Sequence, residues 1–410
     1  MLSSIAIVGA GQAGFQLAAS LRQEGYHGKI VLIGDEAGLP YQRPPLSKAY
    51  LLGKLDASAL SFRSQKFFEE HDITLVQGRV VAIDRTNRSV ALASGTHLPY
   101  DHLVLALGAH NRELPVPGAD LEGVFGLRTL ADADRVMQRF ASAHHVIVCG
   151  AGFIGLEFAA VASAQGCSVH VLELEGRPMA RAVSAETSAR FRAEHEARGV
   201  RFDFGQGLSH IEGVDGRVAH VVTTGGLRLP ADLVMVGVGV LPNAYLAAEA
   251  GLEIENGIKV DGDLLTSDPS ISAIGDCASF PSRHAGRRLR LESVQNAADQ
   301  ARCVAVRLAG KPPQAYGAMP WFWSDQGALR LQIAGLSHGT DATVIVGNQA
   351  ANQFSVLCFK DEQLIAVESV NSAGDHMAAR KLLARRPTLA PREAAAQGFD
   401  LRAFEAMSRT

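Results

Sequence analysis

The stretch Ile5-Ala6-Ile7-Val8-Gly9-Ala10-Gly11-Gln12-Ala13-Gly14 decides how this chain folds. Its first four residues form an apolar run that predicts a buried parallel strand, and the apolar spacing after Gly14 predicts a helix. Between them, Gly9, Gly11 and Gly14 have the Gly-x-Gly-x-x-Gly spacing. In that spacing the first glycine permits a tight turn, the second lets a pyrophosphate approach the backbone, and the third lets helix and strand pack closely. The stretch therefore predicts a dinucleotide-binding unit.

A second expected strand, Ile30–Ile33, supports this prediction. Asp35 follows it and lies 21 residues after Gly14. A carboxylate about 20 residues beyond the glycine motif accepts the ribose hydroxyls of a bound dinucleotide. Strand, glycine loop, helix, strand and acid in this order distinguish a nucleotide site from an ordinary glycine turn.

The same pattern recurs in the middle of the chain. A strand at His145–Cys149 runs into Gly150, Gly152 and Gly155, and the next strand ends at Glu173, 18 residues after Gly155. This is an internal repeat of the first unit. Two complete units in one chain predict two nucleotide sites.

The composition is that of an ordinary globular protein. A chain of 410 residues suggests about three domains at ~150 residues each. A net charge of −3 gives no bulk attraction to nucleic acid or to an acidic membrane. Apolar runs such as 233–241 are too short to span a bilayer. The first motif begins so close to Met1 that no signal peptide is expected, which predicts a cytoplasmic location.

Prolines and a change of pattern divide the chain. The prolines and glycine of residues 115–118 read as a linker and place a domain boundary near residue 110. Earlier in the chain, the prolines of Pro40–Lys48 predict a rigid, extended segment. Near its end, Ser47 is placed to cap a short helix running to Gly53. From about Trp321, alternating strands followed by a helix at Asp375–Arg385 predict a third domain of α+β type.

Five cysteines are widely separated in the sequence. They are Cys149, Cys167, Cys277, Cys303 and Cys358. Neither a CxxC nor a CxxxxC pair occurs, so neither a local redox disulfide nor a zinc or iron–sulfur site with close ligand spacing is expected. We interpret each cysteine as a small buried residue and expect no metal site.

Several segments together carry a family resemblance that covers essentially the whole chain. They are Gly9–Gly14, Pro44–Lys48, Gly150–Glu157, Gly275-Asp276, Glu292–Ala297 and Pro320–Gln326. The chain resembles the FAD-dependent, NAD(P)H-utilising ferredoxin reductases of oxygenase systems, which include putidaredoxin-reductase-like proteins and the reductases of aromatic-ring dioxygenases. The Pro-Pro-Leu-Ser-Lys and Trp-Phe-Trp-Ser-Asp segments are the most specific. Leu107, where the family usually has Thr, and Ser272, where an aromatic is common, depart from its pattern.

The resemblance implies an α/β fold with two Rossmann-like dinucleotide-binding domains in a glutathione-reductase-like architecture, plus a C-terminal α+β domain. The implied FAD-binding domain is 1–110 with 243–320, the NAD(H)-binding domain is 111–242, and the C-terminal domain is 321–410. The implied activity is that of an NADH:ferredoxin oxidoreductase with FAD as cofactor. FAD would accept a hydride from NADH and pass single electrons to a 2Fe–2S ferredoxin that feeds a haem monooxygenase or ring-hydroxylating dioxygenase.

The same resemblance implies two catalytic residues. Lys48 and Glu157 are expected to meet beside flavin N5. A cation there favours the electron-rich reduced ring, and a carboxylate favours the positive, oxidised nicotinamide. The residues expected to bind FAD are Gly9, Gly11, Gly14, Asp35, Lys48, Val80, Arg128, Asp276, Val294 and Trp321, and those expected to bind NAD are Gly150, Gly152, Gly155 and Glu173.

Some of these residues also have ordinary structural interpretations. Asp276 either accepts from the ribityl hydroxyls or caps a helix, and Val294 begins a helix whose N–H groups would face the flavin. Trp321 either lies near the isoalloxazine or only packs at a domain interface. Glu173 favours NADH over NADPH because a carboxylate repels a 2′-phosphate, although Arg177 and Arg181 nearby would weaken that preference.

Basic residues are candidates for docking an acidic ferredoxin, although such clusters are ordinarily only solvated. Arg302 is a candidate by family position. The alternatives are the clusters Arg287, Arg288, Arg290 and Arg380, Lys381, Arg385, Arg386. We expect a monomer or weak homodimer.

The sequence leaves three alternative functions. In the first, rubredoxin is the electron acceptor. Disulfide, peroxide or ascorbate-radical reductases share the fold, but disulfide and peroxidase members need a reactive cysteine facing the flavin, and none precedes Cys149. The third alternative is an NADH-sensing interaction protein resembling apoptosis-inducing factor. Such a protein would be expected to show strong basicity or targeting extensions, and the net charge of −3 does not show that basicity.

Overall fold

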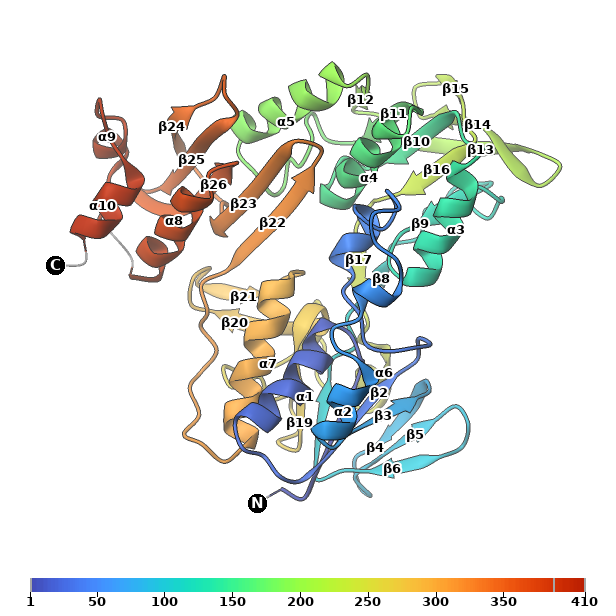
Figure 1. Ribbon diagram of the computed structural model, residues 1–410, viewed down its shortest axis with the longest axis vertical. Coiled ribbons are helices and arrows are strands. Elements are labelled where there is room, and N and C mark those ends of the chain that lie inside the picture. The colour runs from blue at the N-terminus through green and yellow to red at the C-terminus, as the bar shows by residue number, and fades with distance from the viewer. Residues whose placement is uncertain (1, 386–387, 409–410) are drawn as a thin grey trace. The chain divides into compact units, whose positions relative to one another are not determined.

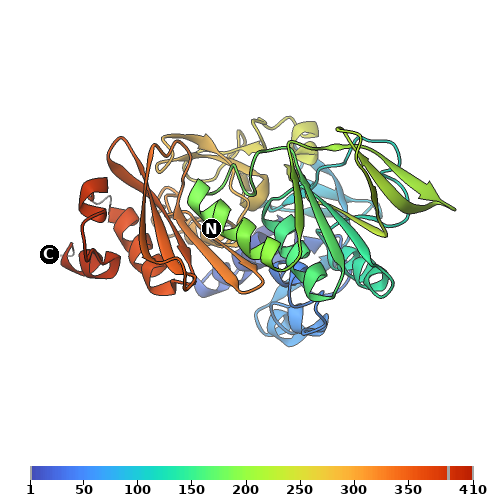
Figure 2. The same ribbon diagram turned by 90° about the horizontal axis from the view of Figure 1, so that it is seen from above.

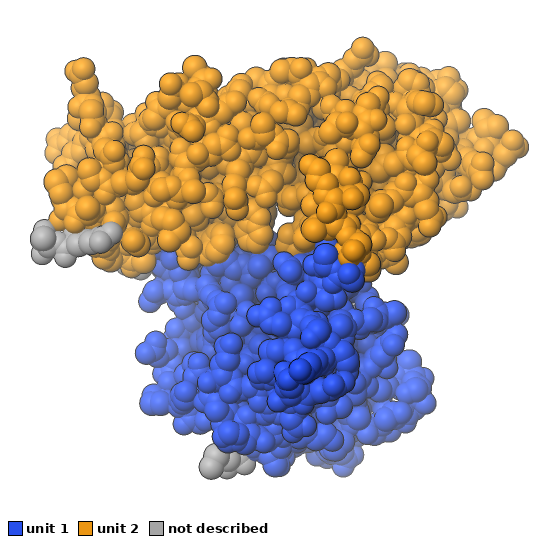
Figure 3. Space-filling model, in the orientation of Figure 1, with its two compact units in different colours: residues 1–42, 58–110, 241–320 blue, residues 43–57, 111–240, 321–410 orange. Residues whose placement is uncertain are grey.

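The chain forms two compact units in a computed structural model that describes residues 2–385 and 388–408. Unit 1 comprises residues 1–42, 58–110 and 241–320, and unit 2 comprises residues 43–57, 111–240 and 321–410 (Figure 3). The grouping differs from the expected three domains, because 43–57 and the C-terminal part belong to the same unit as the second glycine loop. Each unit is thus assembled from segments far apart in the sequence.

A five-stranded parallel sheet in the order β19-β7-β1-β2-β3 forms the centre of unit 1. Its strands are β1 (Ser4–Val8), β2 (Lys29–Gly34), β3 (Ile73–Gln77), β7 (His102–Leu105) and β19 (Ile271–Ala273). Residues 5–8 of β1 and 102–105 of β7 are all buried, as expected of parallel strands covered on both faces. The apolar run that opens the chain is therefore the central strand of this sheet.

Helices and two small sheets surround this parallel sheet. The helices are α1 (Gln12–Gln23), α2 (Gln65–Glu70), α6 (Tyr245–Glu249) and α7 (Val294–Leu308), with 3₁₀ turns η2 (Ser58–Leu60) and η3 (Gly275–Cys277). One small sheet consists of β4 (Val80–Asp84), β5 (Ser89–Leu92) and β6 (His97–Pro99). The other consists of β18 (Ile258–Lys259), β20 (Ala278–Ser282) and β21 (Arg287–Leu289). Helices α1 and α7 lie side by side (Figure 1).

Unit 2 contains a second five-stranded parallel sheet, in the order β12-β11-β10-β16-β9. Its strands are β9 (Val124–Gly126), β10 (His145–Cys149), β11 (Ser168–Glu173), β12 (Arg201–Phe204) and β16 (Leu233–Val236). The associated elements are α3 (Leu130–Phe140), α4 (Phe153–Ala164), α5 (Ala185–Ala197) and the antiparallel strands β13 (Leu208–Val214), β14 (Arg217–Thr223) and β15 (Arg228–Pro230). Strands β8 (Ala109–Asn111) and β17 (Val240–Pro242) pair where the chain passes between the two units.

The C-terminal part of unit 2 is an antiparallel sheet in the order β22-β23-β26-β25-β24. Its strands are β22 (Trp321–Gln326), β23 (Leu329–Gly335), β24 (Ala342–Asn348), β25 (Gln353–Lys360) and β26 (Gln363–Val370). Helix α8 (Ala373–Arg385) lies along one face of this sheet, and α9 (Pro391–Ala394) and α10 (Leu401–Met407) follow (Figures 1 and 2). Two parallel Rossmann-like sheets and this antiparallel domain confirm the expected α/β fold class.

The proline segment corrects one sequence prediction. A 3₁₀ turn, η1 (Pro44–Ser47), ends at Ser47, and only turns follow as far as Gly53. The predicted helix after Ser47 was wrong because the two prolines fix φ for a tight turn before the serine. The Ser47 hydroxyl then donates to another unit 2 residue, Glu157, instead of capping a helix.

Candidate functional site

The first glycine loop has the backbone geometry that its sequence predicts. Gly9 has φ +109°, and a Cβ there would lie 2.1 Å from the carbonyl oxygen of Ala106. A Cβ at Gly14 would lie 1.9 Å from the carbonyl oxygen of Gly9. A Cβ at Gly11 would meet no atom within 4 Å. Two glycines are thus required by packing, whereas Gly11 leaves open space at the start of α1.

The second loop repeats this geometry in unit 2. Gly150 has φ +98°, and a Cβ at Gly155 would lie 2.2 Å from the carbonyl oxygen of Gly150, whereas Gly152 again faces open space. Gly11 and Gly152 are the N-cap residues of α1 and α4, and neither helix has a side-chain cap. Unpaired N–H groups at such a helix start bind phosphate. Both loops therefore fit the pyrophosphate of a dinucleotide.

The two expected ribose acceptors lie in different surroundings. Glu173 ends β11, and its carboxylate accepts from the backbone N–H groups of Ala151 at 2.6 Å and Glu175 at 2.9 Å. It is therefore fixed beside the second glycine loop. Asp35 lies one residue beyond the end of β2 and is exposed. Its carboxylate is thus on the surface next to the first loop's strand.

Lys48 and Glu157 form the ion pair that the family resemblance implies, with 2.8 Å between Lys48 Nζ and Glu157 Oε2. Glu157, in the second turn of α4, is only 2% exposed. Its carboxylate also accepts from the hydroxyls of Ser47 at 2.5 Å and Ser324 at 2.7 Å. A buried carboxylate with three donors is well compensated for its lost hydration. All four residues belong to unit 2, and the position of the pair beside a flavin remains a prediction.

The other residues expected to bind FAD lie on several elements. In unit 1, Val80 begins β4, Asp276 lies in η3 and is half-buried, and Val294 is the first residue of α7. In unit 2, Arg128 precedes α3, and its carbonyl accepts from the Arg43 guanidinium at 2.7 Å. Three of these four residues therefore belong to the same unit as the first glycine loop.

Trp321 begins β22 and lies in an aromatic cluster. Its ring centroid is 5.6 Å from that of Trp323 and 5.6 Å from that of buried His376. The Arg380 guanidinium lies 4.6 Å from the Trp321 ring centroid. Burial lowers the pKa of His376 to about 4, so this ring is neutral at pH 7. Trp321 is thus packed from several sides within unit 2.

The basic docking candidates differ in accessibility. Arg302, on α7, is 56% exposed and pairs with Asp299 at 2.6 Å, and Lys381, on α8, is exposed. Arg290 is only 9% exposed, pairs with Glu292 at 2.7 Å and donates to the Asp276 carbonyl at 3.0 Å. Its guanidinium is therefore not available to dock a partner, and the expectation for Arg290 is corrected. Arg386 lies outside the described residues.

The cysteines are not poised for thiol chemistry. Cys149, Cys277 and Cys358 are buried, and no described cysteine takes part in a disulfide. Burial raises the pKa of the Cys149 thiol to about 12 and that of Cys277 to about 11. Since the thiolate is the nucleophile, neither is reactive near neutral pH. Among residues 2–385 and 388–408, no group of three or more His, Cys, Asp or Glu side chains is arranged to hold a metal ion.

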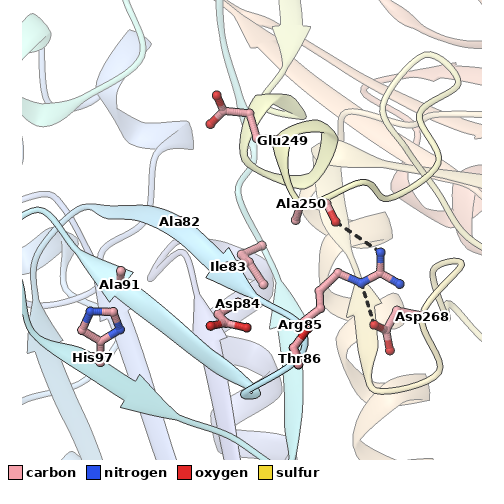
Figure 4. Close-up of a pocket in the computed structure, with 10 residues that line it drawn as sticks. All are labelled: Ala82, Ile83, Asp84, Arg85, Thr86, Ala91, His97, Glu249, Ala250 and Asp268. Carbon is pink, nitrogen blue, oxygen red and sulfur yellow. Dashed lines mark hydrogen bonds and ion pairs between the residues drawn. The ribbon is translucent and has the colours of Figure 1, made fainter.

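One open hollow of about 770 Å³ lies in unit 1 (Figure 4). It is lined by residues of β4 to β6, by Glu249 and by Asp268. Its Arg85 side chain is already paired with the Asp268 carboxylate at 2.8 Å and donates to the Ala250 carbonyl at 3.2 Å (Figure 4). None of the residues expected to bind a nucleotide lines it. We therefore do not assign the chemistry to this hollow.

Sequence reasoning missed the side chains that surround Glu157. Ser324 and Gln326 are fully or almost fully buried and alternate along β22, so they share one face of the strand. They lie in the family segment that the sequence singled out for its tryptophans. The sequence shows no alternation at this point, because Asp325 between them is also polar, so only the folded strand shows which of these side chains are buried.

Two Rossmann-like sheets, each with an uncapped glycine loop, and an antiparallel C-terminal domain form the architecture expected of an oxidoreductase with two dinucleotide sites. Residues 3–301 match the family described as Pyridine nucleotide-disulphide oxidoreductase, and residues 321–405 match the one described as Reductase C-terminal. The chain belongs to the pyridine nucleotide-disulphide oxidoreductase family, among its ferredoxin reductases, and is a flavoprotein oxidoreductase by that membership. In the described residues, we find no helix with both the length and the apolar character needed to cross a membrane.

Relatives match along nearly the full length. Rhodocoxin reductase of Rhodococcus erythropolis is 50% identical over 400 residues, which cover 97% of this chain and 93% of the relative. The ferredoxin reductase for the CYP199A2 system of Rhodopseudomonas palustris is 52% identical, with a TM-score of 0.96 and coverage of 98% and 100%. The covalent putidaredoxin reductase–putidaredoxin complex contains a chain that is 37% identical, with a TM-score of 0.96 and coverage of 100% and 99%.

Proposed function

We propose that this protein is an NADH:ferredoxin oxidoreductase that supplies electrons to an oxygenase through a 2Fe–2S ferredoxin. The observation that carries the proposal is the buried Lys48–Glu157 ion pair in the second turn of α4, directly after an uncapped glycine loop. The similar ferredoxin reductase for the CYP199A2 system and the similar chain in the covalent putidaredoxin reductase–putidaredoxin complex support this partner class. A cytoplasmic location and a monomer or weak homodimer remain predictions.

The proposed FAD-binding domain is 1–110 with 243–320, and the proposed NAD(H)-binding domain is 111–242, followed by the C-terminal domain 321–410. Gly9, Gly11 and Gly14 would hold the FAD pyrophosphate. The other proposed FAD-binding residues are Asp35, Lys48, Val80, Arg128, Asp276, Val294 and Trp321. When bound, FAD accepts a hydride from NADH and releases electrons singly.

Lys48 and Glu157 are the proposed catalytic residues. The Lys48 ammonium supplies positive charge where electron density increases, and the Glu157 carboxylate supplies negative charge where the oxidised nicotinamide becomes positive. Both interactions strengthen as charge develops, so they stabilise the transition state more than the ground state. Ser47 and Ser324 fix the carboxylate in place.

Glu173 supports a preference for NADH over NADPH. Two backbone N–H groups hold its carboxylate at the end of β11, where the sequence pattern places the adenosine ribose. Arg177 donates to the carbonyls of Ala180, Val183 and Ser184. Its guanidinium is therefore already used inside the unit and does not offer a ready contact for a 2′-phosphate.

Arg302 and Lys381 are the proposed docking residues for an acidic ferredoxin. Both are exposed. The Arg302–Asp299 pair is a surface ion pair, which costs little to exchange for a partner carboxylate. Added salt should therefore slow ferredoxin reduction, since exposed charges are screened beyond about 10 Å at 0.1 M.

The test uses the purified protein with three electron acceptors. We expect a yellow protein that reduces a 2Fe–2S ferredoxin with NADH faster than it reduces rubredoxin, with ferricyanide as a control for flavin reduction alone. Stronger rubredoxin reduction would assign the alternative partner. A protein that remains colourless after incubation with FAD would contradict the proposal.

A further inference from the structure

We propose that Ser324, Gln326 and His195 form a chain of hydrogen-bond donors that positions the Glu157 carboxylate. All four residues lie in unit 2, on β22, α5 and α4. The role of Glu157 in hydride transfer rests on the proposed function, whereas the chain of contacts does not. Ser324, Gln326 and His195 are thus assigned as positioning residues.

The chain begins at the carboxylate. Ser324 Oγ lies 2.7 Å from Glu157 Oε1, while Lys48 and Ser47 both donate to Oε2. The two oxygens are therefore held separately, one by residues of the proline segment and the other by β22. Since Glu157 is buried, water cannot readily replace a lost donor. Among these three donors, only Ser324 binds Oε1, so Ser324 fixes the rotation of the carboxylate group.

Gln326 continues the chain along the same face of β22. Its Nε2 donates to Ser324 Oγ at 3.2 Å and to the Met179 sulfur at 3.5 Å. Its Oε1 lies 3.0 Å from His195 Nε2. An amide oxygen can only accept, so His195 Nε2 must carry the proton.

The state of His195 agrees with this direction. Its Nδ1 is buried and has no hydrogen-bond partner among the residues that the structure describes. A neutral ring with its proton on Nε2 leaves Nδ1 as an unprotonated acceptor, which is less costly to bury unpaired than a charged N–H. Burial also lowers the pKa of His195, which keeps the ring neutral.

All three donors therefore point the same way, from His195 through Gln326 and Ser324 to Glu157. Hydrogen bonds that run in one direction polarise each other and are stronger together than singly. The chain also reaches the nucleotide loop, because Met179 donates its backbone N–H to the Ala151 carbonyl at 2.9 Å. The C-terminal domain thus supplies two of the side chains that orient Glu157.

The test is a double-mutant cycle in the FAD-loaded protein, measured by stopped-flow reduction of the flavin with NADH. Ser324→Ala should lower the reduction rate about tenfold, and Gln326→Met about threefold, with less than a twofold change in NADH Kd, since each removes a donor that acts through Glu157. In the Glu157→Gln background, neither substitution should change the rate further. Ser324→Thr, which keeps the hydroxyl, should restore most of the rate.

The control is Ser369→Ala, which removes an equally buried hydroxyl from β26; its partner is Ser355, 3.0 Å away. This variant should keep the reduction rate. Equal rate losses from Ser324→Ala with and without Glu157 would show a merely structural role and overturn the inference, as would an unchanged rate in Ser324→Ala.

Thermal unfolding gives a readout that does not depend on activity. The Tm losses of Ser324→Ala and Glu157→Gln should be clearly less than additive if the two side chains are coupled, and additive losses would contradict the chain. If wild-type flavin is not reduced by NADH, the proposed function fails, while the Tm cycle still decides whether the donor chain exists.

Discussion

The two glycine loops of this chain have the same backbone geometry. Gly9 and Gly150 both have φ near +100°, and a Cβ at Gly14 or Gly155 would collide with the carbonyl oxygen of the loop's first glycine. Gly11 and Gly152 both face open space at a helix start. These features select for phosphate and do not distinguish one dinucleotide from another.

The ends of the following strands differ. The registers pair Val8 with Ile33 in unit 1 and Cys149 with Leu172 in unit 2, so Glu173 corresponds to Gly34 rather than to Asp35. A Cβ at Gly34 would lie 2.7 Å from the Ala10 Cβ. An acid cannot occupy that position in unit 1 without displacing Ala10. In unit 1 the acid therefore lies one residue later in the sequence, at the exposed Asp35.

The helices differ two residues after the third glycine. Gln16 of α1 donates to Ser20 Oγ in the same helix, at 2.9 Å. Glu157 of α4, in the corresponding position, is bonded to Lys48, Ser47 and Ser324. Under the proposed function, phosphate binding would come from the repeated backbone, whereas the reaction and the choice of nucleotide would come from side chains that only one unit carries.

The largest expected effect comes from removing the Lys48 ammonium, which pairs with Glu157 in unit 2. Lys48→Met should slow flavin reduction by NADH about 100-fold or more, because losing one charge at a reacting centre costs about 3 kcal/mol. NADH binding should change far less. Stopped-flow rates across NADH concentrations separate the two effects, with Lys54→Met as a surface control. A rate within threefold of wild type would remove Lys48 from the chemistry.

A smaller effect is expected at the strand ends. Glu173→Ala should raise the NADH KM about 10- to 150-fold, since a lost hydrogen bond to a charged group costs about 1.5–3 kcal/mol, and should leave the NADPH KM nearly unchanged. Asp35→Ala is the matched change in unit 1 and should weaken FAD retention instead. Steady-state kinetics with both nucleotides test this, and an unaltered protein that prefers NADPH would count against the assignment.

The smallest effect concerns stability in acid. Burial lowers the pKa of His102 in unit 1 to about 3, from 6.5 when exposed. The unfolded chain binds this proton and the folded chain does not, so stability falls as the pH drops below 6.5. From pH 7.5 to 5.5 this histidine should cost about 1.4 kcal/mol. Urea titrations should show a smaller acid loss for His102→Gln; an equal loss would refute the assignment.

Much of this architecture could be predicted because it is local in the sequence. The glycine loops, their strands and the acids that follow are encoded within about 30 residues in each unit, as the dinucleotide-binding pattern requires. The pairing of Lys48 with Glu157 was expected only through the family resemblance, and the contact is present.

The rest depends on contacts between distant segments. Ser324 meets Glu157 across 167 residues of sequence, and Gln326 meets His195 across 131. Arg290 is buried and donates to the carbonyl of Asp276, 14 residues earlier, which its sequence neighbours do not reveal. The sequence places strands from about Trp321, but the run of three aromatic and then three polar residues in β22 does not show which side chains the strand buries.

The central claim, that the two loops hold two different nucleotides, is tested most directly by the pair Gly11→Ala and Gly152→Ala. Both positions have backbone angles that alanine accepts and open space for a Cβ, so both variants should fold with a nearly unchanged Tm. The measurement is FAD per chain, followed by the NADH Kd. We predict that Gly11→Ala loses FAD, and that Gly152→Ala keeps FAD but loses NADH binding. Loss of FAD from Gly152→Ala with full retention by Gly11→Ala would contradict the account.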